Sequence, residues 1–417
     1  MKTLIFISPT GTFDNGAEIS IFNLMKYLVA SGDRVINLAP GSDFDNKKDY
    51  KRKCLDTGIE LHFLPSIKWW WEDAPGGLSG TEVSRATSYR ENINSIRHFI
   101  RENQADCVIT NTVNMFQGAM AAASESVPHF WLIHEFPENE FAYYLDKIDF
   151  IQDYSTQIYA VSGKLHDKLN RLFTQKEVKS FSPYSEIIPT HSRIKAADRH
   201  RIVSVGRLTK RKNQLELIKA YEKLKRTDLE LVFIGAWDAD YKKICSDYIR
   251  ERKLKNIHFT GNLDNPWEEL TDKDICVFPS AMETFGLVYV EALLNGIPVV
   301  LSNNPGHLSA YEIFDFGKLY DQGNVDQLAS SLKILLENFD LEKREAVNFI
   351  PIAEERYQIQ NVYATIINDL KNPIDYIPNS IRHIKNLLSH NERKSKLANI
   401  EFKVRLSIQR IKHHFFR

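Results

Sequence analysis

Short apolar runs rich in Val, Ile and Phe alternate along most of the chain with longer segments in which apolar positions recur every three or four residues. The short runs are typical of buried parallel strands, and the longer pattern is typical of helices that pack on a sheet. The expected strands form two groups, at residues 3–8, 33–40, 105–111, 129–135 and 157–162, and at residues 201–206, 229–235, 256–261, 274–280 and 297–302. This order predicts two α/β units, each with a doubly wound, Rossmann-like parallel sheet.

The segment between the two groups of strands is polar and irregular and contains Pro183 and Pro189. We expect an N-terminal Rossmann-like domain, a linker, a C-terminal Rossmann-like domain and a tail, at residues 1–182, 183–198, 199–372 and 373–417. Two such domains that face each other form a central cleft at the carboxyl ends of their strands, where sheets of this kind bind ligands.

Composition narrows the class of protein. The 417 residues exceed what one ordinary core accommodates, which agrees with two domains. Lys+Arg and Asp+Glu both number 54, so the chain lacks the charge bias of a nucleic-acid-binding protein. The four cysteines have neither disulfide nor zinc-site spacing, and no apolar run approaches the roughly 18 residues of a membrane-spanning helix. The first apolar run is too short for a signal peptide, so we expect a cytoplasmic protein.

The stretch "PSAMETFGLVYVEALLNGIPVV", residues 279–300, places a carboxylate where a strand meets a helix. The helix is predicted to begin near Phe285, so Glu283 lies in the loop at the carboxyl end of the preceding strand. The backbone amides of Phe285, Gly286 and Leu287 then point outward as an anion site, and Gly286 allows close approach of a ligand. The alternative is that Glu283 only caps the helix.

Glu291 lies on the same predicted helix among Leu and Val residues, so we expect it to be partly buried. A buried carboxylate needs hydrogen-bond donors, and the vicinal diol of a sugar offers two at suitable spacing. The alternative is that Glu291 lies on the surface.

A basic turn follows the first strand of the second domain. The strand ends at Gly206, and Arg207, Lys210, Arg211 and Lys212 follow before the next helix begins. Arg207 and Lys212 are expected on the cleft side, where two fixed cations beside a helix N-terminus could neutralise a diphosphate without a metal ion. The alternative is a solvated turn without a ligand.

Four segments of the second domain, "VGRLTKRKNQLELIKAY", "IHFTGNLDNPWEEL", "DICVFPSAMETFGLVYVEALLNGIPVVLSN" and "GKLYDQGNVDQLASSL", have the order and spacing of a known family. They resemble the retaining glycosyltransferases of family 4, which have the GT-B fold. The resemblance covers essentially all of the second domain. The first domain matches more loosely, through "NGAEISIFNLMKYLVASGDRV", "WLIHEF" and "YAVSGKL".

The resemblance implies a role for each matching residue of the second domain. Arg207 and Lys212 would hold the diphosphate of a nucleotide-sugar donor. Glu283 would bond hydroxyls of the donor sugar beside the three helix amides, and Glu291 would bind the ribose diol of the nucleotide.

Two residues of the first domain are also implied. Gly16 would let its loop approach the phosphates, and His134 would contact the transferred sugar, although a lone histidine at the end of an apolar strand is often structural. The sequence has Asn15–Gly16 where the family often has a glycine pair, and "SFSPYSEI" replaces a family segment before the linker.

The resulting hypothesis is an enzyme that moves a sugar from a nucleotide diphosphate to an acceptor with retained configuration. The family implies a donor phosphate oxygen as the base, and neither a metal ion nor another cofactor is expected. A growing cell-surface glycan on a lipid carrier is the expected acceptor. The alternatives are a nucleotide-sugar epimerase or a phosphorylase of the same fold, and an inactive scaffold subunit.

Residues 381–417 carry ten Lys/Arg and two Glu, a net charge of +8. Apolar residues recur there at three- and four-residue intervals, at Leu397, Ile400, Val404, Ile408, Ile411 and Phe415. This pattern predicts a basic amphipathic helix on an anionic membrane surface, with packing on protein as the alternative. Trp69, Trp70 and Trp71 have a similar ambiguity between core packing and contact with an acceptor or a membrane.

Overall fold

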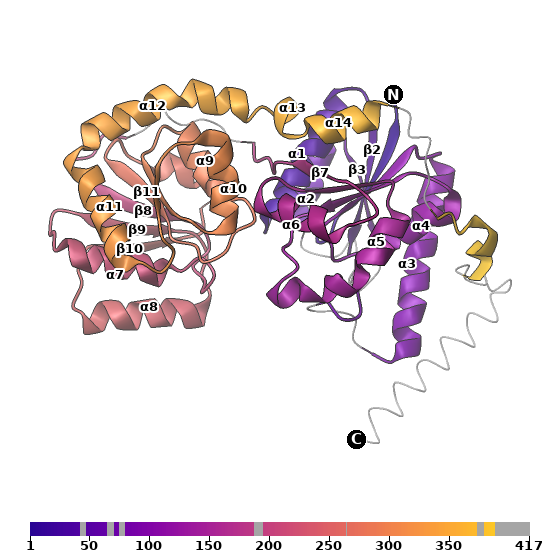
Figure 1. The fold of residues 1–417 in the computed structure, drawn as a ribbon, viewed down its shortest axis with the longest axis horizontal. Helices are drawn as coiled ribbons and strands as arrows, with labels where there is room; N and C mark the ends of the chain where they lie inside the picture. The colour runs from indigo at the N-terminus through magenta and orange to yellow at the C-terminus, as the bar shows by residue number, and fades with distance from the viewer. Residues whose placement is uncertain are drawn as a thin grey trace, which may run out of the picture.

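The computed structural model describes residues 1–41, 47–64, 71–74, 80–186, 195–263, 265–372 and 379–387. Two parallel sheets with helices around them lie next to each other along the longest axis of the molecule (Figure 1). The predicted pair of doubly wound α/β domains is therefore confirmed.

The first domain contains a seven-stranded parallel sheet in the order β3-β2-β1-β4-β5-β6-β7. Its strands are β1 (Thr3–Ile7), β2 (Arg34–Pro40), β3 (Glu60–Leu64), β4 (Cys107–Asn111), β5 (His129–Ile133), β6 (Gln157–Val161) and β7 (Val178–Phe181). Its helices are α1 (Gly16–Ala30), α2 (Lys48–Thr57), α3 (Glu82–Glu102), α4 (Gln117–Glu125), η1 (Asn139–Lys147), α5 (Ile148–Tyr154) and α6 (Lys164–Leu172). In the register of the central strands, Ile5 of β1 lies between Ile36 of β2 and Val108 of β4.

The second domain contains a six-stranded parallel sheet in the order β10-β9-β8-β11-β12-β13. Its strands are β8 (Arg201–Val205), β9 (Glu230–Ile234), β10 (Ile257–Gly261), β11 (Asp274–Phe278), β12 (Val299–Ser302) and β13 (Lys318–Tyr320). Its helices are α7 (Gln214–Leu224), α8 (Ala239–Glu251), η3 (Pro266–Glu269), α9 (Leu287–Leu294), α10 (Pro305–Phe314), α11 (Val325–Glu337) and α12 (Phe339–Arg356).

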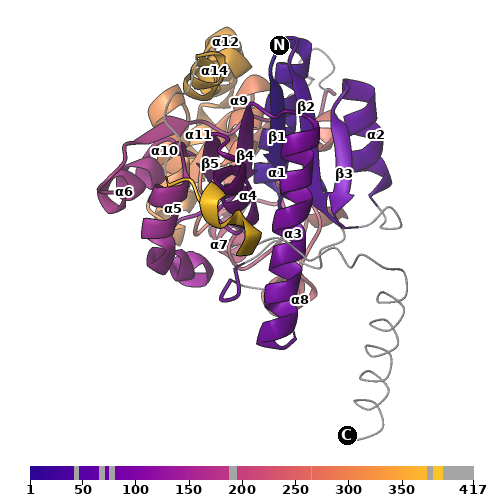
Figure 2. The same cartoon turned by 90° about the vertical axis from the view of Figure 1, so that its right-hand side faces the viewer.

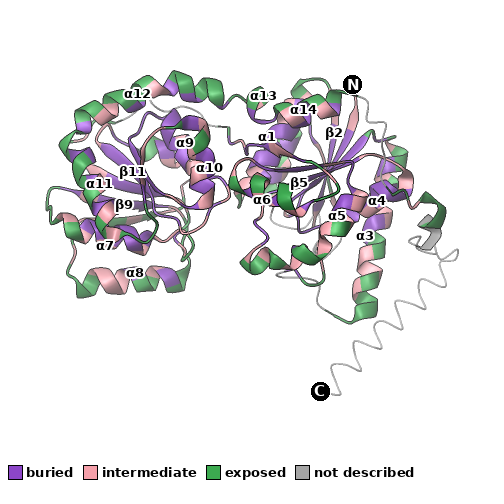
Figure 3. Ribbon diagram, viewed as in Figure 1, coloured by how far each residue is buried: buried purple, intermediate pink, exposed green. Residues whose placement is uncertain are grey.

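Alternate residues of the central strands join cores on opposite faces of each sheet. Leu4 and Phe6 of β1 belong to one apolar cluster, whereas Ile5 belongs to another. In β11, Cys276 and Ile275 divide between two clusters in the same way. Each fully buried Ile or Phe contributes about 1.5–3 kcal/mol, so both faces stabilise the sheet. Figure 3 shows the buried strands enclosed by helices whose outer faces are exposed.

Three edge strands, β3, β7 and β13, were not among the predicted strands. β3 is exposed or half-buried at four of its five positions and β7 is half-buried at two of its four, and β13 has only three residues. An edge strand that is partly solvated does not require the continuous apolar run by which the central strands were found.

The C-terminal helices return to the first domain, which differs from the expectation that residues up to 372 belong to the second. From α12, the chain continues into α13 (Ile359–Val362) and α14 (Ala364–Lys371), which lie on the first domain (Figures 1 and 2). Tyr363 donates a hydrogen bond to the Ser20 carbonyl at 2.8 Å. Asp369 accepts one from the Tyr159 hydroxyl at 2.6 Å, so polar contacts as well as packing hold α14 there.

The carboxyl edges of the two sheets meet in the middle of the molecule. Gly16 begins α1, and a Cβ atom on it would lie 3.1 Å from the Leu287 side chain at the start of α9. Ser309 of α10 accepts a hydrogen bond from the backbone amide of Lys164 in α6 at 3.1 Å. The loops at both carboxyl edges therefore face each other, as the sequence predicts for a cleft between the domains.

The described part of the tryptophan segment packs into the protein. The indole of Trp71 donates to the Val113 carbonyl at 2.9 Å, and its ring lies 4.6 Å from that of Phe116. This agrees with core packing for Trp71, whereas Trp69 and Trp70 lie outside the described residues.

The start of the predicted tail also contacts the first domain. The amide of Ile381, just before η4 (Arg382–Leu387), donates to the Ala123 carbonyl of α4 at 3.1 Å. The predicted amphipathic helix beyond residue 387 lies outside the described residues. No helix within the described ranges has the length and apolar character needed to cross a membrane.

Candidate functional site

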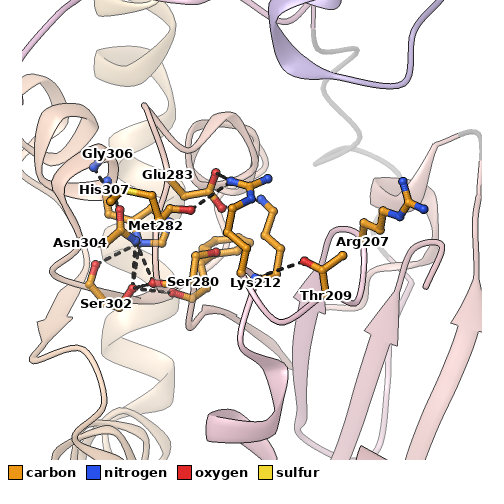
Figure 4. A network of polar contacts seen from close by, with 12 residues as sticks. Arg207, Thr209, Lys212, Ser280, Met282, Glu283, Ser302, Asn304, Gly306 and His307 are labelled. Carbon is orange, nitrogen blue, oxygen red and sulfur yellow. Dashed lines mark hydrogen bonds and ion pairs between the residues drawn. The ribbon is translucent and has the colours of Figure 1, made fainter. Parts of the chain in front are cut away.

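Adjacent strands bring the two predicted donor-binding loops together. Because β8 and β11 pair directly, the basic turn after β8 and the Glu283 loop after β11 emerge side by side. The amide of Ala281 donates to the Arg211 carbonyl at 2.8 Å and joins the two loops. Figure 4 shows the side chains that converge at this edge.

Glu283 is held by two cations. Its side chain is only 9% exposed, with Oε1 2.7 Å from the Lys212 ammonium and Oε2 3.1 Å from the Arg211 guanidinium. Burial alone would raise the pKa of Glu283, but the positive charges of Lys212 and Arg211 lower it to about 2. The carboxylate is therefore ionised at neutral pH and can accept hydrogen bonds from hydroxyl groups.

The two oxygens of this carboxylate differ in their surroundings. Oε1 is fully buried, and its contact in the described structure is the ion pair with the Lys212 ammonium. Lys212 itself is 17% exposed, so the pair is largely shielded from solvent. This arrangement suits a ligand with both a hydroxyl group and an anionic group.

Arg207, in contrast, lies apart from the Lys212–Glu283 pair, beyond Thr209 (Figure 4). Arg207 is exposed, and its backbone carbonyl accepts a hydrogen bond from the Gln214 side chain at 3.1 Å. Arg211 occupies the position beside Glu283 instead. The sequence placed both arginines in one basic turn, but their spacing gives no sign of which side chain turns toward the carboxylate.

The start of α9 depends on glycine. Gly286 has φ 90°, and a Cβ atom there would lie 2.8 Å from the His307 ring. A Cβ atom on Gly306 would lie 2.2 Å from the Glu283 carbonyl oxygen. Both glycines therefore allow the Glu283 loop, Phe285 included, to lie directly against the start of α10.

His307 supports this loop from behind and was not singled out by the sequence. Its Nδ1 lies 3.0 Å from the Ser302 carbonyl, and Asn304, the N-cap of α10, accepts from the amide of His307 at 3.1 Å. Burial lowers the pKa of His307 to about 4, so the ring is neutral at pH 7. Its Nε2 is buried without a hydrogen-bond partner in the described structure.

Glu291 lies on α9, as predicted, and is partly buried. Burial raises its pKa, while hydrogen bonds from the Ser185 hydroxyl and the Trp267 indole oppose this shift. The indole nitrogen lies 3.0 Å from Oε2. In this structure two protein donors therefore contact the carboxylate that the family resemblance assigns to a ribose diol.

On the opposite side of the cleft, the loop before α1 is held by Glu18. This side chain is fully buried, and its Oε1 accepts hydrogen bonds from the amides of Thr10 and Gly11 at 2.6 and 2.9 Å. Asn15 caps α1 by accepting from the Glu18 amide at 3.0 Å. The position of Gly16 is thus fixed by its neighbours. Glu18 was not predicted from the sequence as part of the site.

His134 follows β5 and lies beside β4 on the same side of the sheet. Its Nε2 is 2.9 Å from the Oδ1 atom of Asn111, and its ring packs edge-on against Phe181. Burial lowers the pKa of His134 to about 3, so the ring is uncharged at neutral pH. Asn111, the last residue of β4, was not predicted as part of the site.

Solved structures and family models agree with this architecture. HepE of Anabaena, solved in complex with UDP and glucose, superimposes with a TM-score of 0.71 at 18% identity, covering 89% of this chain and 100% of that chain. Residues 190–350 match the family described as glycosyl transferases group 1. The chain has the GT-B fold. This GT-B assignment confirms the predicted fold class.

Curated relatives match part of the chain. An N-acetylgalactosaminyltransferase of Campylobacter jejuni, whose name specifies a diphospho-undecaprenol-linked sugar, is 34% identical over 146 residues, covering 34% of this chain. The capsular polysaccharide glycosyltransferase CapH of Staphylococcus aureus is 31% identical over 159 residues, covering 37% of this chain. These matches span 39% and 44% of the relatives' own lengths, which is less than half of each. Both relatives are named as transferases, which favours this class over an epimerase.

Proposed function

We propose that the protein is a retaining glycosyltransferase that uses a nucleotide-diphosphate sugar in the biosynthesis of a cell-surface glycan. The observation that carries the proposal is the buried Lys212–Glu283 pair at the carboxyl edge of the second sheet, opposite the glycine at the start of α1. A fixed ammonium beside a carboxylate matches a ligand in which a phosphate and a sugar hydroxyl are neighbours. The names of the group 1 relatives support the same class of reaction.

The proposed catalysis is mainly stabilisation of the departing diphosphate. Lys212 supplies a fixed positive charge, and the first amides of α9 add the dipole of a helix N-terminus. Glu283 orients the donor sugar, while Lys212 and Arg211 keep that carboxylate ionised. Arg207 lies at the same edge and would contact the outer phosphate after its exposed side chain turns inward.

We propose that Glu291 binds the ribose diol in exchange for its present donors. The Trp267 indole and the Ser185 hydroxyl hold the carboxylate in place before the donor arrives. A diol offers two hydroxyl donors, so the exchange leaves no buried acceptor without a partner.

The proposed acceptor is a glycan on a lipid diphosphate, as in the name of the Campylobacter relative. The basic tail would hold the enzyme at an anionic membrane surface where such lipids lie, because each Lys or Arg near that surface adds about 1 kcal/mol of attraction. Its ten Lys/Arg and two Glu support this part of the proposal.

A thermal-shift screen with nucleoside diphosphates tests the donor site. A ligand at 100 times its dissociation constant adds about 2.7 kcal/mol of stability, which raises the melting temperature by about 5–10 °C for domains of this size. We expect one base to stabilise the wild type and to stabilise Lys212→Met much less. Hydrolysis of the matching nucleotide sugar without acceptor would then identify an enzyme. No shift with any nucleoside diphosphate would reject the function.

A further inference from the structure

The side-chain amide of Asn111 joins His134 to the first turn of α1. Its Nδ2 lies 3.1 Å from the Ala17 carbonyl, and its Oδ1 lies 2.9 Å from the His134 Nε2. A carbonyl oxygen can only accept a hydrogen bond, so the atom of Asn111 that faces Ala17 must be the amide nitrogen. The carbonyl oxygen of Asn111 therefore faces His134, and this contact requires a proton on Nε2.

A neutral imidazole carries one ring proton, so a proton on Nε2 leaves Nδ1 with a free lone pair. In the described residues, the Nδ1 atom of His134 has no hydrogen-bond partner and is not fully buried. It therefore retains accessible surface. The neighbouring carboxyl group, that of Glu135, accepts from the backbone amide of His134 at 3.0 Å rather than from the ring.

The location of the Nδ1 atom of His134 indicates which kind of ligand it can bind. His134 and Asn111 both lie at the carboxyl ends of their strands. Ala17 follows Gly16, where an added Cβ atom would lie 3.1 Å from the Leu287 side chain of the second domain. The lone pair of Nδ1 thus belongs to the same edge as the loop that faces the donor site. Hydroxyl groups are donors that a neutral imidazole nitrogen can bind without any change of charge.

We propose that Asn111 is a positioning residue that fixes His134 as the Nε2-protonated tautomer, so that Nδ1 accepts a hydrogen bond from a hydroxyl group of the transferred sugar. This inference rests on the proposed function for the identity of the hydroxyl donor, but not for the tautomer. The Nδ1 atom of His134 then accepts a hydrogen bond from the sugar hydroxyl. The opposite tautomer would present an N–H group there, which would donate to the hydroxyl oxygen instead.

Nitrogen NMR of the full chain labelled at histidine tests the tautomer directly. The chain has 13 histidines, and the His134 signals are those that disappear in His134→Gln. We expect a protonated Nε2 and an unprotonated Nδ1 at pH 7. In Asn111→Asp, the added carboxylate should favour a proton on both nitrogens. A protonated Nδ1 in the wild type would overturn the proposal.

Turnover tests the use of the lone pair. The side-chain amide of an asparagine can occupy the position of Nδ1, whereas that of a glutamine extends to the position of Nε2. We expect His134→Asn to keep turnover within about tenfold of the wild type and His134→Gln to lose about 100-fold, since one buried hydrogen bond is worth about one to two decades. The reverse order would overturn the proposal.

A matched control comes from the same two strands. The Thr110 hydroxyl lies 2.8 Å from Nε2 of His129, so Thr110→Val removes a comparable contact to a buried histidine outside the site. We expect Thr110→Val to lower stability but keep turnover and the His134 tautomer, whereas Asn111→Asp changes both. Equal effects of the two variants would show a merely structural role. A lack of turnover with every sugar nucleotide would reject the proposed function, whereas the NMR result does not depend on turnover.

Discussion

Replacing Lys212 by methionine removes the charge beside Glu283 and keeps most of the side-chain volume. Both side chains are mostly buried, at 17% and 9% exposure, so solvent screens their interaction little. The pKa of Glu283 falls from an ordinary value of 4.5 to about 2 in the folded chain. This difference corresponds to about 3 kcal/mol of stability at neutral pH, of which Lys212 is the largest favourable source.

The pH dependence of this contribution follows from the direction of the shift. Because the folded pKa is depressed, the stabilisation is fully present above pH 4.5 and is lost as the pH falls toward 2. In Lys212→Met only the more exposed Arg211 remains beside the buried carboxylate. The pKa of Glu283 should therefore rise toward its ordinary value, so the loss of stability on acidification should be smaller and should end at a higher pH than in the wild type.

Urea denaturation of four proteins measures the coupling: the wild type, Lys212→Met, Glu283→Gln and the double variant. We expect a coupling energy of about 2 kcal/mol at pH 7, falling toward zero near pH 2. Turnover of Lys212→Met should decrease by about two to three decades, as for loss of one preorganised donor. Lys210→Met is the control, because Lys210 is an exposed residue of the same turn. If Lys212→Met cost the same stability with and without Glu283, the two side chains would not be coupled and the reasoning would fail.

Three further outcomes are expected. Turnover should persist in excess EDTA, since fixed cations serve the diphosphate; a loss restored by magnesium or manganese would contradict this. Glu291→Ala should weaken binding of the free nucleoside diphosphate by about 10- to 100-fold in calorimetric titrations, whereas Glu283→Ala should spare it and lower turnover. Equal losses of nucleotide affinity would disprove the assignment of the two ends. Removal of residues 388–417 leaves the contact of Ile381 with α4 intact and should abolish co-sedimentation with anionic vesicles at low salt. Binding that ignores salt, or no binding by the full chain, would end the membrane hypothesis.

The sequence predicted those parts of the fold in which burial is complete. Central strands such as β4 and β11 are buried at every position, so their apolar runs are continuous and recognisable. The edge strands β3 and β7 lacked this signal because one side of each lies near solvent. The return of α14 to the first domain was equally hidden, since contacts such as that of Asp369 with Tyr159 join residues 210 positions apart.

The residues of the candidate site also divide into those that the sequence could predict and those that it could not. Glu283 and Lys212 were predictable because each follows a strand, and the carboxyl ends of paired parallel strands must lie side by side. The sequence could not predict which arginine turns toward Glu283, because both Arg207 and Arg211 lie in the basic turn and only the direction of the side chain distinguishes them.

Asn111 shows most clearly the limit of what the sequence can predict. It is a polar residue that ends an apolar strand, and its role depends on two partners distant in sequence. The Ala17 carbonyl fixes which atom of the amide faces His134, and that orientation in turn fixes the ring proton. No pattern of apolar and polar positions encodes such a sequence of donors and acceptors. It appears only when three segments of the first domain are brought to one edge of the sheet, and there a single amide decides whether the histidine offers a proton or a lone pair to the cleft.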